Sequence, residues 1–299
     1  MIAVTILGNN SAVPAHNRHP TSQVVQTGEH SFLVDCGEGT QMQMDFYKIR
    51  RRRINHIFIS HLHGDHYFGL IGLLTSQALN NRLNELHIYS PKGLEKIIQI
   101  QLDITDSELP YPLHFHVLEK EEIVFEDKKV AVRCFKVNHR IECWGFKFQE
   151  KKNLRKIDIQ QAQKYKIPTS FYEKLHEGKD YINEDQVIKN ELVTTAHAPG
   201  KSYAYCADTV YDESICEKIK GADLIYHEAT YLHELEKKAE SRFHSTSKQA
   251  AMIAKKSGAK RLIIGHFSSM YDSLEKFQEE ACEVFKNTDI AEEGVCYLV

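Results

Sequence analysis

The sequence Ser60-His61-Leu62-His63-Gly64-Asp65-His66 places three histidines and one aspartate within six positions. It follows the apolar run 56–59 and precedes the apolar run 67–74, a pattern that predicts a strand, a tight loop and a helix. Alternate residues of an extended chain share one face, so His61 and His63 can bind one metal ion. Gly64 lets the backbone turn, so that Asp65 and His66 can face a second ion. The motif therefore predicts a metal centre at the end of a strand.

The composition is that of a globular protein. The chain has 299 residues, of which 42% are hydrophobic and 26% charged, which excludes a disordered or collagen-like protein. No apolar run approaches the roughly 20 residues of a membrane span, and the N-terminus lacks the basic start of a signal peptide, so we expect a cytoplasmic protein with no membrane partner. The seven cysteines are scattered and form no C-x-x-C pair, which indicates reduced thiols. The net charge of −3 gives no overall attraction to a polyanion, so a polyanionic partner would have to bind to local basic patches.

Residues with metal-type or acidic side chains recur where further strands are expected to end. A strand at 31–34 leads to Asp35, which either orients a metal-binding histidine or belongs to an ordinary turn. The loop 8–14 either lines a phosphate site or is likewise a turn. The other strand-end residues are His139 after a strand at 130–135, Asp208 after 202–206, Glu228 after 224–226 and His266 after 261–264.

Together these residues form two ligand sets that share one carboxylate. One set is His61, His63 and His139, and the other is Asp65, His66 and His266. Asp208 can bridge them, because a carboxylate offers two oxygens. Nitrogen and oxygen ligands without thiolate favour zinc, with manganese or iron as alternatives, and two such ions activate a water for hydrolysis. His244 lies just before a helix predicted by the capping-box spacing of Thr246 and Gln249. With Glu228 as an orienting carboxylate, His244 would protonate the leaving oxygen.

Two basic segments lie outside this ligand pattern. The run Lys48-Ile49-Arg50-Arg51-Arg52-Arg53 has the composition of a nucleic-acid patch, although such runs also form solvated surfaces. Residues 151–179 hold eight Lys or Arg against three Asp or Glu, so this segment is either a basic arm that binds a polyanion or a charged surface insertion. We expect the core to resume at Leu192-Val193-Thr194-Thr195. The sequence thus predicts one α/β domain over residues 1–299 with an inserted arm at about 151–180.

The motifs resemble those of the metallo-β-lactamase fold and, within it, of the ribonuclease Z family, endonucleases that mature tRNA 3′ ends. The H-x-H-x-D-H motif at 61–66 specifies only the superfamily, whereas its combination with H-E-A-T at 227–230 and H-S-T at 244–246 is specific to ribonuclease Z. The resemblance spans nearly the whole chain and also rests on residues 7–14, 32–41, 138–140, 199–209 and 265–266.

The resemblance implies a four-layer αβ/βα sandwich, two Zn²⁺ per subunit, a homodimer, and a flexible arm that grips the elbow of tRNA. The implied function is removal of the 3′ trailer from tRNA precursors by phosphodiester hydrolysis. The resemblance also implies the same seven metal ligands, a role in proton transfer for Asp65, and His244 paired with Glu228 as the general acid. The expected RNA contacts are Ser245, Thr246, Lys151, Lys152, Arg155 and Lys156.

The arm departs from the family pattern. Family arms usually carry a Gly-Pro element after an Ile-Pro pair, whereas here Ile167-Pro168 is followed by Thr169-Ser170-Phe171-Tyr172. We expect tRNA affinity to fall with added salt, through residues 151–179 and 50–53. Two other readings are a small-molecule phosphodiesterase or other hydrolase on the same fold, and a metal-binding scaffold without catalysis. The basic arm and H-S-T favour an RNA substrate, and the complete ligand set favours catalysis.

Overall fold

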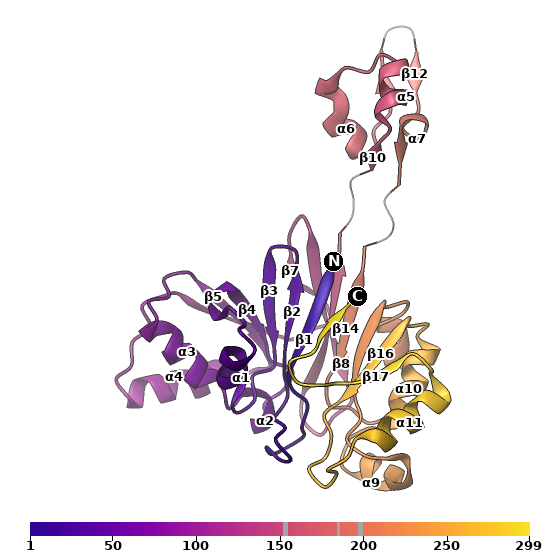
Figure 1. Ribbon diagram of the computed structural model, residues 1–299. Helices are drawn as coiled ribbons and strands as arrows, with labels where there is room; N and C mark the ends of the chain where they lie inside the picture. The colour runs from indigo at the N-terminus through magenta and orange to yellow at the C-terminus, as the bar shows by residue number, and fades with distance from the viewer. Residues whose placement is uncertain (152–154, 184–185, 197–199) are drawn as a thin grey trace. The chain divides into compact units, whose positions relative to one another are not determined.

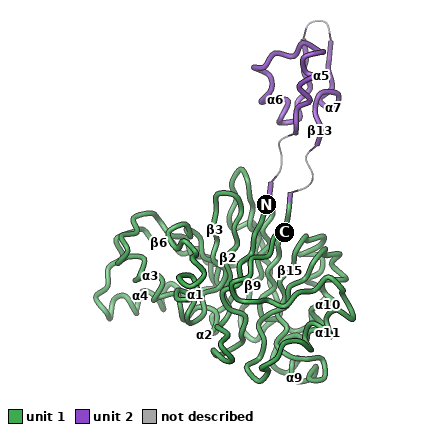
Figure 2. The backbone as a smooth tube through the Cα atoms, viewed as in Figure 1, with its two compact units in different colours: residues 1–149, 201–299 green, residues 150–200 purple. Residues whose placement is uncertain are grey.

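The computed structural model describes residues 1–151, 155–183, 186–196 and 200–299, which form two compact units (Figures 1 and 2). The larger unit, residues 1–149 and 201–299, holds two seven-stranded sheets. The first sheet has the order β18 (Cys296–Leu298), β1 (Ile2–Gly8), β2 (Ser22–Thr27), β3 (His30–Val34), β4 (Ile54–Phe58), β5 (Leu86–Ser90), β6 (Leu113–Val117). The second has the order β17 (Thr288–Ile290), β16 (Arg261–Gly265), β15 (Leu224–Glu228), β14 (Ser202–Cys206), β9 (Cys143–Glu150), β8 (Val130–Val137), β7 (Ile123–Glu126).

Helices cover the outer faces of both sheets (Figure 1). Alternate strand residues face opposite sides, so Phe58 of β4 contacts Phe146 and Phe148 of the second sheet, whereas Ile57 packs on the helix side. The fold is therefore the expected four-layer αβ/βα sandwich. The helices of the first half are α1 (Thr40–Phe46), α2 (Gly64–Tyr67), α3 (Leu70–Leu79) and α4 (Leu94–Ile104), and those of the second half are α8 (Ile215–Lys218), α9 (Glu236–Ser241), α10 (Ser247–Lys256) and α11 (Glu275–Val284).

Parallel pairing brings strand ends from distant parts of the chain to one edge. Strands β14, β15 and β16 are parallel neighbours, as are β3 and β4. Their carboxyl ends lead to Asp208, Glu228 and His266 in the second sheet and to Asp35 and the H-x-H-x-D-H loop in the first. The capping box predicted for α10 is confirmed, since the Thr246 hydroxyl accepts a hydrogen bond from the backbone N–H of Gln249. Within the described ranges, none of the helices has the length and apolar character needed to cross a bilayer.

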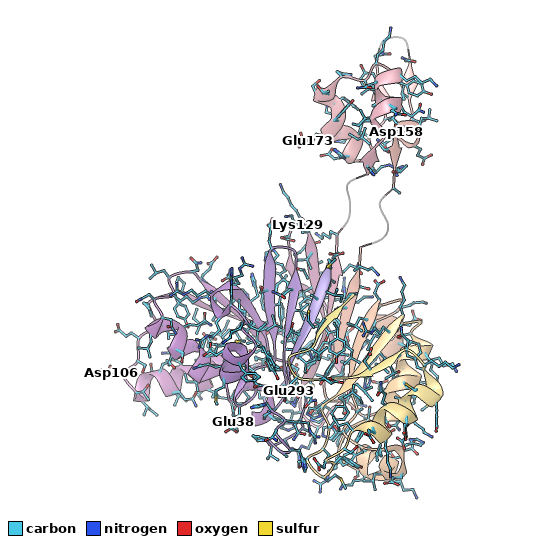
Figure 3. The ribbon with its side chains drawn as sticks, in the orientation of Figure 1. Glu38, Asp106, Lys129, Asp158, Glu173 and Glu293 are labelled. Carbon is cyan, nitrogen blue, oxygen red and sulfur yellow. The ribbon has the colours of Figure 1, made fainter. Side chains whose placement is uncertain are left out.

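The smaller unit, residues 150–200, has a hydrophobic core of its own (purple in Figure 2). Asp158, labelled in Figure 3, caps its first helix by accepting a hydrogen bond from the backbone N–H of Gln161 at 3.0 Å. Its elements are β10 (Lys156–Ile157), α5 (Ile159–Lys164), η2 (Thr169–Phe171), α6 (Tyr172–His176), β11 (Tyr181–Ile182), β12 (Val187–Ile188), α7 (Asn190–Val193) and β13 (Thr194–Thr195). The core residues are Ile157, Ala162, Ile167, Leu175, Ile188 and Val193.

The prediction that the main core resumes at Leu192 was wrong. Val193 is buried in the core of the smaller unit, and Thr194–Thr195 pair with β10 of the same unit. A short run of apolar and β-branched residues has strand propensity, but it does not reveal which sheet the strand joins. The smaller unit therefore extends to Gly200, beyond the arm boundary expected near residue 180.

Candidate active site

The first ligand group brings together three imidazoles and one carboxylate. His61 Nε2 lies 2.9 Å from His63 Nδ1, which lies 3.2 Å from His139 Nε2. Asp208 Oδ2 lies 3.6 Å from His61 Nε2 and 3.8 Å from His139 Nε2. Ligands at 2.0–2.1 Å around a tetrahedral ion are separated by about 3.4 Å, so these four atoms have suitable spacing for one cation. Burial lowers the pKa of His63 to about 4 and also lowers those of His61 and His139, which keeps their nitrogen lone pairs free at neutral pH.

The second ligand group shares Asp208 with the first. His66 Nε2 and His266 Nε2 lie 3.3 Å apart, and Asp65 Oδ2 lies 3.6 and 3.4 Å from them. Asp208 Oδ1 lies 3.5 Å from His66 Nε2 and 3.2 Å from His266 Nε2. The two oxygens of Asp208 thus face different groups, Oδ2 the first and Oδ1 the second.

The environment of Asp208 tests whether these residues fit a cation. Its Oδ1 is buried and makes no hydrogen bond within the part of the chain that the structure describes. Burial opposes the charge of this carboxylate, but His266 and His66 outweigh that effect and hold its pKa well below the usual range. A buried carboxylate that stays ionised and lacks a donor needs a positive partner. The nitrogen and oxygen set around it fits divalent metal ions.

Asp35 and Ser60 orient the imidazoles from behind. Asp35 Oδ2 lies 2.8 Å from His66 Nδ1, so it fixes the ring with Nε2 directed at the ligand group. Asp35 also accepts hydrogen bonds from Ser60 N at 2.7 Å and from the hydroxyl of Tyr205 at 2.5 Å. The Ser60 hydroxyl lies 3.0 Å from His61 Nδ1. Of the two roles left open for Asp35, the structure favours the orienting one.

His244 and Glu228 form a buried pair beside the ligand groups. His244 Nδ1 lies 2.9 Å from Glu228 Oε1. Glu228 is fixed by hydrogen bonds from the backbone N–H groups of Thr209, Ser245 and Thr230, each at 3.0 Å. Burial alone would lower the pKa of His244, but the Glu228 carboxylate dominates and raises it to about 9. The ring is therefore protonated at neutral pH and able to donate a proton.

Thr230 links this pair to the second ligand group and was not singled out from the sequence. Its hydroxyl lies 2.8 Å from Glu228 Oε2, 3.2 Å from His244 Nδ1 and 2.9 Å from His266 Nδ1. The only signal in the sequence was its position as the last residue of H-E-A-T. Its contacts depend on β15 and β16 lying side by side, which the sequence does not state.

A cavity of about 510 Å³ opens over these groups. The loop after β1 lines it through Ser11 and Ala12, and the Ala12 N–H donates to Asp65 Oδ2 at 2.7 Å. The loop thus lies at the site rather than in a remote turn. The other lining residues are His63, Gly64, Asp65, Phe68, His139, Arg140, Asp208, Thr230, Tyr231, Arg242, His244, Ser268 and Ser269.

The expected RNA contacts are not all at this cavity. Ser245 and Thr246 are buried and do not line it, since the Ser245 hydroxyl donates to the Thr209 carbonyl and Thr246 caps α10. Lys152 lies outside the described residues. Lys156 is exposed on the smaller unit, and Lys151 is half-buried. Arg155 donates to the Thr194 hydroxyl at 2.6 Å, which ties it to the smaller unit's own structure.

Comparison with known families identifies the class. The family model described as Anti-Pycsar protein Apyc1 matches residues 2–154, and the model of the beta-lactamase superfamily domain matches residues 146–267. Together with the ligand geometry, these matches define a metal-dependent hydrolase of the metallo-β-lactamase fold.

Curated relatives identify the family within this class. Ribonuclease Z of Bacteroides thetaiotaomicron is 42% identical over 297 residues, which cover 98% of this chain and 94% of the relative. Ribonuclease Z of Porphyromonas gingivalis is 42% identical over 294 residues, with 97% of both chains covered. The chain therefore belongs to the ribonuclease Z family and is an endoribonuclease that hydrolyses phosphodiester bonds. The crystal structure of human tRNase Z, short form, aligns with a TM-score of 0.72 at 27% identity, covering 99% of this chain and 98% of that one.

These findings confirm the prediction of a metal-dependent endoribonuclease of tRNA processing on this fold. The reading as a small-molecule phosphodiesterase is not favoured.

Replacing Asp35 tests its orienting role. Asp35→Asn removes the charge that holds the His66 ring, and we expect affinity for divalent metal to fall about 10- to 100-fold. Competition with a chromogenic chelator measures that affinity, and circular dichroism verifies the fold. The control Glu38→Gln changes an exposed carboxylate three residues further on, labelled in Figure 3, and should leave affinity unchanged. Equal affinities for Asp35→Asn and the parent protein would contradict the role.

Proposed function

We propose that this endoribonuclease removes the 3′ trailer from tRNA precursors at the cavity over the two ligand groups. The proposal rests chiefly on one observation, the division of the Asp208 oxygens between the groups beside the His244–Glu228 pair. We propose two zinc ions, with His61, His63 and His139 as ligands of one, Asp65, His66 and His266 as ligands of the other, and Asp208 between them. Such ions would supply an activated water and neutralise charge on the phosphoryl oxygens.

The side chains around the cavity then handle the protons. Asp65, held by the Ala12 N–H, lies at the cavity wall and can accept a proton released by the attacking water. His244, which also lines the cavity, would protonate the leaving 3′ oxygen of the tRNA. Glu228 does not line the cavity, so we assign it to holding the His244 ring and stabilising its charged form.

Cleavage of an end-labelled tRNA precursor tests this function. We expect a single cut near the discriminator base, loss of the cut with chelator, and recovery with added zinc. Recovery with manganese or iron(II) but not with zinc would replace the metal assignment and keep the reaction. If no metal restored cleavage while two ions were bound per chain, the substrate assignment would be wrong.

Replacing His244 separates acid catalysis from metal binding. His244→Ala should lower kcat for the precursor about 10²- to 10⁴-fold, since the leaving oxygen loses its proton donor, while two metal ions per chain remain bound. Single-turnover cleavage and metal analysis measure the two quantities. His114→Ala, which alters an exposed histidine on the edge strand β6, is the matched control and should not change kcat. An unchanged kcat in His244→Ala would remove this residue from the mechanism.

The smaller unit is proposed to bind the body of the tRNA. Lys156, Lys164 and Lys166 are exposed on this unit. The segment after Ile167-Pro168 differs from the Gly-Pro element of the family pattern, but the unit still has a hydrophobic core. Reversing all three charges to Glu should raise KM for the precursor and weaken its dependence on salt, because phosphate contacts release counterions. Initial rates between about 50 and 200 mM salt measure both effects. The Lys→Arg triple variant keeps the charge and should resemble the parent protein; an unchanged KM in the Glu variant would contradict the proposal.

The homodimer remains part of the proposal. Met42 and Phe46 lie one helical turn apart on α1 and are 71% and 72% exposed. Exposed apolar side chains on one helix face favour an oligomer in which a second subunit covers them. Light scattering of the purified protein measures its mass. Because tRNA precursors are made inside the cell, the proposal also includes a cytoplasmic location.

A further inference from the structure

A second cavity, of about 480 Å³, is lined by arginines and takes no part in the chemistry described above. We propose that this arginine pocket binds a phosphate group of the RNA substrate away from the scissile bond. The inference rests on the proposed function for the identity of the RNA. The lining residues are Asp45, Ile49, Arg50, Arg51, Arg52, Arg53, Gln77, Asn80 and Arg82.

The local fold gathers the arginines at one place. The Arg53 N–H donates to the Arg50 carbonyl at 3.0 Å, which closes the short 3-10 turn η1 (Arg51–Arg53). An extended strand would direct successive side chains to opposite faces, whereas this turn directs the run toward one concave surface. The basic run at residues 50–53 therefore lines a concave pocket and is not only a solvated surface.

The pocket carries more positive charge than its surroundings neutralise. Its wall has five guanidinium groups and one carboxylate, that of Asp45, which pairs with Arg51 at 2.9 Å. Arg52 donates to the Asn80 carbonyl at 2.6 Å. Arg50 and Arg53 are exposed and have no ion pair within the described parts of the chain. Two free guanidinium groups that line one concave surface can both donate N–H groups to a phosphate, which accepts paired N–H donors.

Arg82 forms the fixed floor of the pocket. It is 4% exposed and donates to the Ile54 carbonyl at 2.9 Å, to Gln77 Oε1 at 2.6 Å and to Asn55 Oδ1 at 2.7 Å. With its donors used in this way, it adds positive potential without contacting the ligand. We therefore assign ligand contact to Arg50 and Arg53 and leave Arg82 with a structural role.

The pocket and the metal ligands lie at opposite ends of β4. Arg53 directly precedes this strand, and Ser60 and the H-x-H-x-D-H loop follow its other end, where α2 begins (Figure 1). Seven residues at roughly 3.3 Å each separate Arg53 from Ser60 by about 20 Å. An anion in the pocket is thus too far away to be the scissile phosphate. The pocket should contribute to binding of a large substrate and not to the chemical step.

The double variant Arg50→Gln/Arg53→Gln tests this assignment. We expect KM for the tRNA precursor to rise about tenfold with kcat unchanged, and the slope of log affinity against log salt to fall in magnitude by about 0.9, as for one lost phosphate contact. Turnover of the small diester bis(p-nitrophenyl) phosphate should not change, because it is too short to reach the pocket. Light scattering verifies that the variant keeps the mass of the parent protein.

A matched control removes two charges elsewhere. Lys255 and Lys276 are exposed on α10 and α11, and Lys255→Gln/Lys276→Gln should leave KM and the salt slope near the parent values. An equal effect in the control would mean that only the overall charge of the protein matters, and it would contradict the assignment of phosphate binding to this pocket. Parent-like KM and salt slope in the arginine variant would overturn it as well.

Two further measurements distinguish the sources of phosphate and the level of failure. Titration with inorganic phosphate, followed by thermal unfolding, detects a small-anion site; stabilisation that the arginine variant loses while its KM for tRNA stays unchanged would overturn the RNA assignment. If the parent protein failed to cleave any tRNA precursor, the proposed function would fall. Fluorescence anisotropy with mature tRNA would still test whether the arginine pocket binds RNA. The affinity for RNA should drop in the arginine variant and not in the lysine control.

Discussion

The buried carboxylate of Asp208 is the constraint on which the site depends. Its two oxygens face two separate groups of imidazoles, and Oδ1 has no hydrogen-bond donor among the described residues. Such a group is tolerated inside a protein only when positive charge compensates it. Three of the surrounding histidines, His66, His61 and His266, are in turn held by Asp35, Ser60 and Thr230, so the orientation of these three rings depends on a further hydrogen bond behind each. Metal binding and the structure of this edge are therefore interdependent.

The two sheets make this arrangement possible. Parallel strands end at one edge, and facing sheets bring the edge of the first against that of the second, so residues near positions 60, 208 and 266 meet. The same geometry leaves the opposite end of β4 free for a different task. The arginine pocket lies there, about 20 Å from the two ligand groups. This separation suits a long polyanion, whereas a small diester is too short to span it. A chain with a net charge of −3 can thus bind RNA through local positive surfaces.

As a member of the ribonuclease Z family, the protein acts on a long substrate. The features described above suit a substrate of that length. The smaller unit has a core of its own, and its exposed lysines lie on the short helices and strands that this core supports and on the turns between them. Its Thr-Ser-Phe-Tyr segment after Ile167-Pro168 forms a turn and the start of α6, so the departure from the usual Gly-Pro element changes a local segment and not the presence of the unit. In the proposed function, catalysis and RNA binding are distributed over separate parts of the chain.

The sequence by itself determined several local elements and which residues are candidate ligands. The H-x-H-x-D-H loop and the capping box of α10 are encoded by neighbouring residues, because side-chain period and hydrogen bonding within a turn depend on short separations. Only the tertiary structure decided which oxygen of Asp208 faces which group, that Thr230 joins Glu228 to His266, that Ser245 and Thr246 are buried, and that Val193 belongs to the smaller unit. These facts depend on contacts between segments far apart in the chain, and local propensity carries no information about which distant partner a strand or side chain will meet.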